Sequence, residues 1–300
     1  MAAFRRDAGK HAARRPAFKS CGAPLPVVTG RAPCSDITTT RLQPMSAATP
    51  LALPHPPPIQ PDWALFLDVD GCLLDFADRP EHVIVPAGLR EDLARLRHAL
   101  DGALALVSGR SLEQLDHLFP GMELVAAGLH GLQVREACGS LHLPGEAPIE
   151  LGRVREAAEQ VVRDHPGARV EDKGVALALH WRTAPHARSA LEAIAHSSVG
   201  HLPGYRLQHG NCVVELRPGG QHKGSAIERL MQRAPFSGRL PVYAGDDFTD
   251  EDGFAMMNSL GGLSVIVGER RPTQARHGIE HTEALRRWLA DAAHRLGPAA

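Results

Sequence analysis

Two hydrophobic periods alternate along the chain from residue 63, one typical of buried strands and one typical of amphipathic helices. The runs "ALFLDV" (64–69) and "ALALVSG" (103–109) are short and continuously apolar, as expected of strands buried on both faces. Between them, leucines recur at helical spacing in "GLREDLARLRHAL" (88–100). The pattern therefore predicts a strand, a helix and a second strand in succession.

The same alternation continues on both sides of the middle of the chain. A helix that begins with Ser111 and Gln114 in capping-box register is expected next, followed by a strand in "ELVAAGLHG" (123–131). Later segments of the same kind are "LPVYAGDD" (240–247), "LSVIVG" (263–268) and the amphipathic helix "TEALRRWLADAAHRL" (282–296). Alternating strands and helices predict an α/β fold in which helices flank a parallel sheet.

Residues 137–218 have a different pattern, which predicts an inserted α+β module. Helices are expected in "LGRVREAAEQVVRDH" (151–165) and "APHARSALEAIAH" (184–196), and strands in "ARVED" (168–172), "GVALALHWR" (174–182), "YRLQH" (205–209) and "CVVELRP" (212–218). Gly210 and Asn211 favour a turn between the last two strands. We therefore expect residues 61–136 and 219–300 to form one core and residues 137–218 to form a separate domain.

Residues 1–60 show no sustained hydrophobic period, and six prolines fall between positions 50 and 61. This composition predicts a disordered tail and linker. The Arg-rich, acid-poor start would suit an organelle transit peptide. An upstream start codon, with Met45 as the working initiator, is the simpler alternative and the one we favour.

Charge and cysteine content exclude several classes of protein. The net charge is -1, and residues 1–44 hold eight Lys/Arg against two Asp, so the rest of the chain is acidic and a nucleic-acid-binding body is not expected. Five cysteines without a C-x-x-C pair predict neither a disulfide framework nor a zinc cluster, and fit a reducing cytoplasm. No apolar run approaches the roughly 20 residues that span a bilayer.

Asp68 and Asp70 stand two residues apart at the end of the first predicted strand. The carboxyl ends of parallel strands are where ligands bind in open α/β sheets. Two carboxylates this close repel each other, and a shared proton or a divalent cation relieves the repulsion. A turn or helix-capping pair would give the same spacing, so this motif alone decides nothing.

A second acidic cluster, "AGDDFTDED" (244–252), also follows a predicted strand and contains Asp246, Asp247 and Asp250. Hard oxygen ligands of this kind suit magnesium, although acidic residues are also favoured at a helix start. Ser108, after another strand, and Lys223, at the start of a predicted helix, could both bind phosphate oxygens.

In the order Asp68-x-Asp70, Ser108, Lys223, Asp246-Asp247, these residues resemble the four motifs of the haloacid dehalogenase-like phosphatases. Four longer stretches also resemble the trehalose-6-phosphate phosphatase family: "GLHG", "EDKGVALALHWR", "CVVELRPGGQHKG" and "GDDFTDEDGFAMMNSLGGLSVIVG". The resemblance covers most of residues 63–296 and implies a Rossmann-like core with an inserted cap, or lid, at 137–218. Cys72 stands where the family usually has threonine, which puts the hydroxyl contact of that threonine in doubt.

Phosphate-monoester hydrolysis needs a nucleophile, an acid/base group and neutralisation of charge. We expect Asp68 to attack phosphorus and form an aspartyl phosphate, and Asp70 to protonate the sugar oxygen and then deprotonate water. Ser108 and Lys223 would hold phosphoryl oxygens. The resemblance implies that Mg²⁺ binds Asp68, Asp246 and the Asp70 main-chain carbonyl, with Asp247 or Asp250 completing or orienting the shell.

The resemblance also implies which residues contact a small sugar phosphate. These are Lys173, His180 and Glu215 in the lid and, less directly, Arg110, His130 and Arg182. A related sugar phosphatase or phosphomutase would keep the four motifs and change the lid, whereas a noncatalytic module would be expected to lose Asp68, Asp70 or Lys223. We expect a cytoplasmic monomer that binds neither nucleic acid nor membrane.

Overall fold

The computed structural model describes residues 53–77 and 82–297. The expectations for a tail, a targeting segment and the initiator Met45 therefore lie outside the described residues, apart from residues 53–60. Segment 53–60 packs on the core: Ile59 is fully buried, and the carbonyl of Pro57 accepts a hydrogen bond from the indole of Trp288 at 3.2 Å. The prediction of a disordered linker is wrong for these residues, because apolar side chains in this segment pack against the core.

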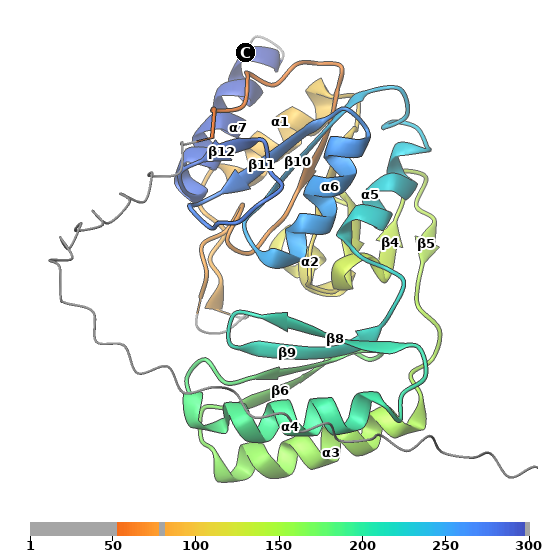
Figure 1. Cartoon of the computed structure of the whole chain (residues 1–300). Helices are drawn as coiled ribbons and strands as arrows, with labels where there is room; N and C mark the ends of the chain where they lie inside the picture. Colours follow the sequence, from red (N-terminus) through yellow and green to blue (C-terminus); the bar gives the residue numbers. More distant parts are fainter. Residues whose placement is uncertain (1–52, 78–81, 298–300) are drawn as a thin grey trace, which may run out of the picture. The chain divides into compact units, whose positions relative to one another are not determined.

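A large sheet holds eight strands in the order β12-β11-β10-β1-β2-β3-β4-β5 (Figure 1). The strands are β1 (Trp63–Leu67), β2 (Leu104–Val107), β3 (Val125–Gly128), β4 (Gln133–Arg135), β5 (Leu141–His142), β10 (Leu240–Gly245), β11 (Leu263–Val267) and β12 (His277–Ile279). The six strands from β12 to β3 pair in parallel, whereas β4 and β5 pair antiparallel. The α/β fold with a parallel sheet is therefore confirmed.

Helices cover both faces of this sheet, and their ends follow from local sequence. They are α1 (Leu89–Ala99), α2 (Leu112–Leu118), α5 (Lys223–Met231), α6 (Glu251–Ser259) and α7 (Thr282–Leu296). Helices α1 and α7 pack together on one face, and α5 and α6 pack together on the other (Figure 1). Helix α2 begins with the predicted capping box between Ser111 and Gln114.

A small antiparallel sheet, of order β6-β7-β9-β8, lies between the two parts of the chain that build the large sheet. It comprises β6 (Arg169–Asp172), β7 (Leu177–His180), β8 (Tyr205–Gly210) and β9 (Val213–Pro218), together with helices α3 (Ile149–Asp164) and α4 (Arg188–Val199). Leu177, Leu179, Val214 and Leu216 belong to a hydrophobic cluster separate from that of the large sheet. The residues between them, including Glu215, therefore point to the opposite face.

The ends of two predicted segments differ from the expectation. Strand β5 pairs with β4, so the large sheet reaches His142, whereas the expected boundary between core and cap is at residue 136. The turn between β8 and β9 consists of Asn211 and Cys212, with Cys212 at φ 61°, because Gly210 still pairs with Val213. The division into core and cap domains stays a prediction.

Within residues 53–77 and 82–297, no helix has both the length and the apolar character that crossing a membrane requires.

Candidate active site

The ends of three neighbouring parallel strands bring the predicted motifs together. Leu67 in β1 is in register with Leu106 in β2 and with Ala244 in β10. Asp68, Ser108 and Asp246, which follow these strands, therefore lie at the same edge of the sheet. Residue Cys72, in the loop after β1, is fully buried.

Lys223 lies between two buried carboxylates. Its Nζ is 2.6 Å from Oδ1 of Asp250 and 3.0 Å from Oδ1 of Asp68, and all three side chains are buried. Burial alone would lower the pKa of Lys223, but the two carboxylates raise it, so the amine is charged. Burial and the nearby Asp250 raise the pKa of Asp68 to about 8, against the opposing effect of Lys223.

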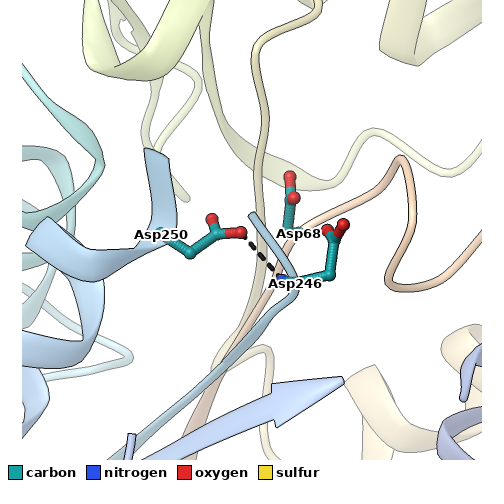
Figure 2. A group of neighbouring side chains, drawn as sticks. All are labelled: Asp68, Asp246 and Asp250. Atoms are coloured by element: carbon teal, nitrogen blue, oxygen red, sulfur yellow. Dashed lines mark hydrogen bonds between the residues drawn. The ribbon is translucent and has the colours of Figure 1, made fainter. Parts of the chain in front are cut away.

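Asp68, Asp246 and Asp250 form a cluster in which one oxygen of each carboxylate lies within 4.8 Å of the others (Figure 2). Burial, followed by repulsion from Asp68 and Asp250, raises the pKa of Asp246 to about 9. Its Oδ1 is buried without a hydrogen-bond partner among the described residues. A buried, unpartnered carboxylate oxygen beside another acid fits a divalent cation, which would relieve the repulsion.

Asp250 and Asp247 have different surroundings. Oδ2 of Asp250 accepts hydrogen bonds from the main-chain amides of Asp246 and Asp247, both at 2.8 Å, and its Oδ1 accepts from Lys223 and from the hydroxyl of Tyr243. Asp247 instead caps the short turn η4 (Phe248–Asp250). Asp250 therefore belongs to the buried carboxylate cluster, whereas Asp247 lies beside it.

Asp70 is held by Arg110 through both carboxylate oxygens, at 2.8 Å from Nε and 2.6 Å from Nη2. The Oγ of buried Ser108 accepts a hydrogen bond from the main-chain amide of Arg110 at 3.2 Å. Between the acidic residues, Gly71 has φ 80°, and a Cβ there would collide with Asp246 and the ring of Phe76. A glycine is therefore required at this position by both backbone and space.

A cleft of about 940 Å³ extends from these residues to the small sheet. Its lining includes Asp68, Asp70, Ser108, Arg110, His130, Lys173, His180, Arg182, Lys223 and Asp247. The structure therefore brings ten of the thirteen predicted site residues to one cleft. Asp246, Asp250 and Glu215 do not line it but contact or adjoin residues that do.

Glu215 on β9 joins the small sheet to the large one. Its Oε2 lies 3.1 Å from Nζ of Lys173 and 3.7 Å from Nε2 of His130, and Lys173 also donates to the carbonyl of Gly109 at 3.2 Å. Burial would raise the pKa of Glu215, but Lys173 and His130 lower it, so it is ionised. Its other oxygen is buried without a hydrogen-bond partner in the described part of the chain.

His130 is held in an unusual backbone conformation. Leu129 and His130 both have positive φ, at 49° and 53°, and the imidazole lies so close to Gly109 that a Cβ there would be 2.6 Å from its Nε2. Burial lowers the pKa of His130 to about 4 despite the neighbouring Glu215, so the ring is neutral at pH 7. His180 and Arg182, by contrast, have partners within the small sheet and its loops. His180 contacts Glu171 at 2.9 Å, and Arg182 donates to the carbonyl of Asn211 at 3.2 Å.

Sequence reasoning missed four residues of this region: Glu171, Tyr243, Arg270 and Arg217. Glu171 lines the cleft, and Gln114 of α2 donates to its carboxylate at 3.3 Å. Arg217 could have been identified from its spacing. It is a charged residue two positions from Glu215 in an apolar strand, so both side chains must point to the same side of β9. Nothing in the local sequence distinguishes Tyr243 or Arg270.

Arg217 is fully buried and joins the small sheet to the loops of the large one. Its Nη2 donates to the carbonyls of Leu129 at 3.2 Å and Gln221 at 3.1 Å, and its Nη1 donates to Oε1 of Gln208 at 2.7 Å. It thereby connects the turn that presents His130 with the segment that leads into Lys223.

Comparisons with known proteins agree with this arrangement. Residues 66–284 match the model of the trehalose-phosphatase family. The chain is 43% identical over 217 residues to the trehalose-6-phosphate phosphatase of Escherichia coli K12, which covers 72% of this chain and 81% of that protein. It is 40% identical over 231 residues to a probable trehalose-phosphate phosphatase of Sinorhizobium fredii, covering 76% and 87%.

Solved structures also resemble the chain. A trehalose-6-phosphate phosphatase related protein is 28% identical, with a TM-score of 0.61 over 77% of this chain and 97% of that one. The C-terminal domain of Candida albicans trehalose-6-phosphate phosphatase has a TM-score of 0.66 at 20% identity, over 77% and 91% of the two chains, which supports the fold. With two thirds or more of its sequence matched, the chain belongs to the trehalose-phosphatase family.

Proposed function

We propose that this protein hydrolyses trehalose 6-phosphate to trehalose and phosphate, as the last step of trehalose synthesis. The observation that carries the proposal is that buried Asp68 and Lys223, with Asp246 beside Asp68, lie at one end of a cleft whose other end is lined by polar residues of the small sheet. Family membership supports the choice of substrate.

In the first step, Asp68 attacks phosphorus, the bond from phosphorus to the sugar oxygen breaks, and Asp70 gives a proton to that oxygen. Arg110 contacts both oxygens of Asp70, so Asp70 must leave at least one of these contacts to reach the leaving group. In the second step, Asp70 removes a proton from water, which attacks phosphorus and releases Asp68 and phosphate. Lys223 and Ser108 stabilise the phosphoryl oxygens.

Asp68 and Asp246, with the main-chain carbonyl of Asp70, would hold Mg²⁺, which supplies positive charge for the phosphoryl oxygens when bound. Both oxygens of Asp250 already accept hydrogen bonds, so we assign it to orienting Lys223 and the loop at Asp246. Asp247 caps the turn η4, which supports a place for it outside the set of residues that would bind Mg²⁺ directly.

Residues 137–218, which include the small sheet, would form a cap that binds the sugar through Lys173, His180, Arg182 and Glu215. Arg110 and His130 would contribute from the core. Lys173 already contacts the loop between Ser108 and Arg110, so sugar binding and phosphoryl chemistry share one loop. Free thiols at Cys72, Cys138 and Cys212 support a reducing cytoplasm as the location.

A phosphate-release assay over several sugar phosphates tests the proposal. We expect trehalose 6-phosphate to give the highest specificity constant, and Asp68→Asn to abolish release because the amide is isosteric but a poor nucleophile. Equal turnover of glucose 6-phosphate would point to a more general sugar phosphatase. Undiminished turnover by Asp68→Asn would remove Asp68 from the mechanism.

A further inference from the structure

The acidic loop Asp246–Glu251 is held from its outer side by Arg270, which lies in the segment between β11 and β12. Nε of Arg270 donates to the main-chain carbonyl of Asp246 at 3.0 Å, and Nη2 donates to that of Asp247 at 3.2 Å. Nη2 also pairs with the carboxylate of Glu251. The guanidinium lies over the ring of Phe248, 4.5 Å from its centroid.

This loop needs an anchor because its carboxylates repel Asp68. Lys223 contacts Asp68 and Asp250, but the structure gives the carboxylate of Asp246 no ion pair among the residues it describes. Relaxation of the loop would let Asp246 move away from Asp68. Arg270 opposes this movement through the main chain, so the carboxylate of Asp246 stays available for a cation.

Arg270 is itself fixed. Its Nη1 donates to the carbonyl of Pro272 at 2.9 Å, and its side chain is 16% exposed. Glu251, its ion-pair partner, accepts a second hydrogen bond from the amide of Gln274 at 2.7 Å. The planar guanidinium thus contacts three carbonyls, a carboxylate and an aromatic face at once, which a lysine cannot do.

We infer that Arg270 is a positioning residue for the metal site: by clamping the main chain at Asp246 and Asp247, it holds the carboxylate of Asp246 beside Asp68 and sets the affinity for Mg²⁺. The inference rests on the metal site of the proposed function. Outer residues that orient ligands typically contribute a factor of about 10–100 to metal affinity.

Calorimetric titration of the full chain with Mg²⁺ alone tests this role without reference to activity. We expect Arg270→Ala to raise the dissociation constant for Mg²⁺ about tenfold or more, and Arg270→Lys to fall between this variant and the wild type. Arg271→Ala is the matched control, because Arg271 is exposed on the same segment and contacts only the carbonyl of Arg270 among its described hydrogen bonds. Its dissociation constant should stay within about twofold of the wild-type value.

Kinetics give a second readout. The concentration of Mg²⁺ that gives half-maximal activity should rise in Arg270→Ala, while kcat at saturating Mg²⁺ stays near the wild-type value, because Arg270 does not itself line the cleft. Equal Mg²⁺ affinity in Arg270→Ala and wild type, even with a lower melting temperature, would overturn the role of Arg270 and leave the proposed function unaffected. Absence of Mg²⁺ binding by the wild type would overturn both the inference and the proposed metal. If Arg270→Ala does not fold, the comparison of Arg270→Lys with Arg271→Ala decides.

Discussion

At the scale of single residues, the site concentrates negative charge that the folded chain only partly neutralises. Lys223 offsets Asp68 and Asp250, while Asp246 keeps a buried oxygen without a partner among the described residues. Burial, followed by repulsion from Asp68 and Asp250, raises the pKa of Asp246 to about 9. Such a carboxylate opposes folding at neutral pH unless it is protonated or bound to a cation.

Asp246→Asn should therefore have opposite effects on the free and the metal-bound protein. In excess chelator, the variant should melt at a higher temperature than the wild type, because it removes one member of the repelling cluster. Magnesium should raise the melting temperature of the wild type but not of the variant, because a bound ligand stabilises only the form that binds it.

Phosphate release by the wild type should stop in chelator and return with Mg²⁺. Full activity in excess chelator would contradict the metal assignment.

His130 gives a pH dependence whose sign is fixed by its lowered pKa of about 4. The unfolded chain takes up a proton below pH of about 6.5, whereas the folded ring stays neutral down to about 4, so stability falls as the pH drops through this window. Between pH 7 and pH 5 this loss is about 2 kcal/mol for this one group. His130→Asn, in which Asn tolerates the left-handed backbone, should lose that part of the pH dependence.

Urea unfolding of both proteins at pH 7 and pH 5 measures this effect. A difference in stability between the two pH values that is the same in wild type and His130→Asn would show that the imidazole is not buried in its neutral form.

At the scale of elements, the sequence predicted the helices and strands that have a hydrophobic period, and the polar motifs that follow the ends of strands. The helices and long strands have clear hydrophobic periods. Asp68, Ser108 and Asp246 each follow a predicted strand, and the parallel pairing of β10, β1 and β2 brings them to one edge of the sheet. Strands β4, β5 and β12, at two or three residues, are too short to show a period. Whether Asp247 or Asp250 joins the cluster depends on the fold of η4, which spacing alone does not determine.

Spacing from Glu215 can identify Arg217, but not its partners. These are the main-chain carbonyls of Leu129 and Gln221 and the side-chain oxygen of Gln208, which only the folded chain brings around the guanidinium. Arg217→Ala should reduce the free energy of unfolding by about 2–4 kcal/mol, since charge-assisted hydrogen bonds are lost and buried carbonyls are left unpaired. Arg206→Ala is the control: Arg206 is paired with Arg217 across β8 and β9 and donates to the carbonyl of Gln221 at 3.3 Å. Urea unfolding should show the larger loss for Arg217→Ala, and equal losses would contradict its role as a link.

At the scale of the whole molecule, the proposed mechanism assigns phosphoryl chemistry and sugar recognition to opposite ends of one cleft, which meet at the loop Ser108–Arg110. Ser108 faces the phosphoryl end, Arg110 holds Asp70, and the carbonyl of Gly109 between them accepts a hydrogen bond from Lys173 of the small sheet. Binding of the sugar by the small sheet can therefore affect the geometry of the acid/base group directly, and energy from remote contacts can raise catalysis at phosphorus.

A substitution at Glu215, the buried carboxylate that holds Lys173 and lies beside His130, tests this connection. Trehalose 6-phosphate has a second ring that can reach the small sheet, whereas p-nitrophenyl phosphate does not. A charge-assisted hydrogen bond contributes roughly 1.5–3 kcal/mol, so the isosteric change Glu215→Gln should lower kcat/KM for trehalose 6-phosphate about ten- to a hundredfold. Hydrolysis of p-nitrophenyl phosphate, slow in both proteins, should stay nearly equal. Glu159→Gln, in which an exposed carboxylate of α3 beside Arg155 is neutralised, should change neither substrate. If Glu215→Gln impaired both substrates alike, Glu215 would support the fold rather than recognise the sugar, because a structural defect affects every phosphate ester that reaches Asp68.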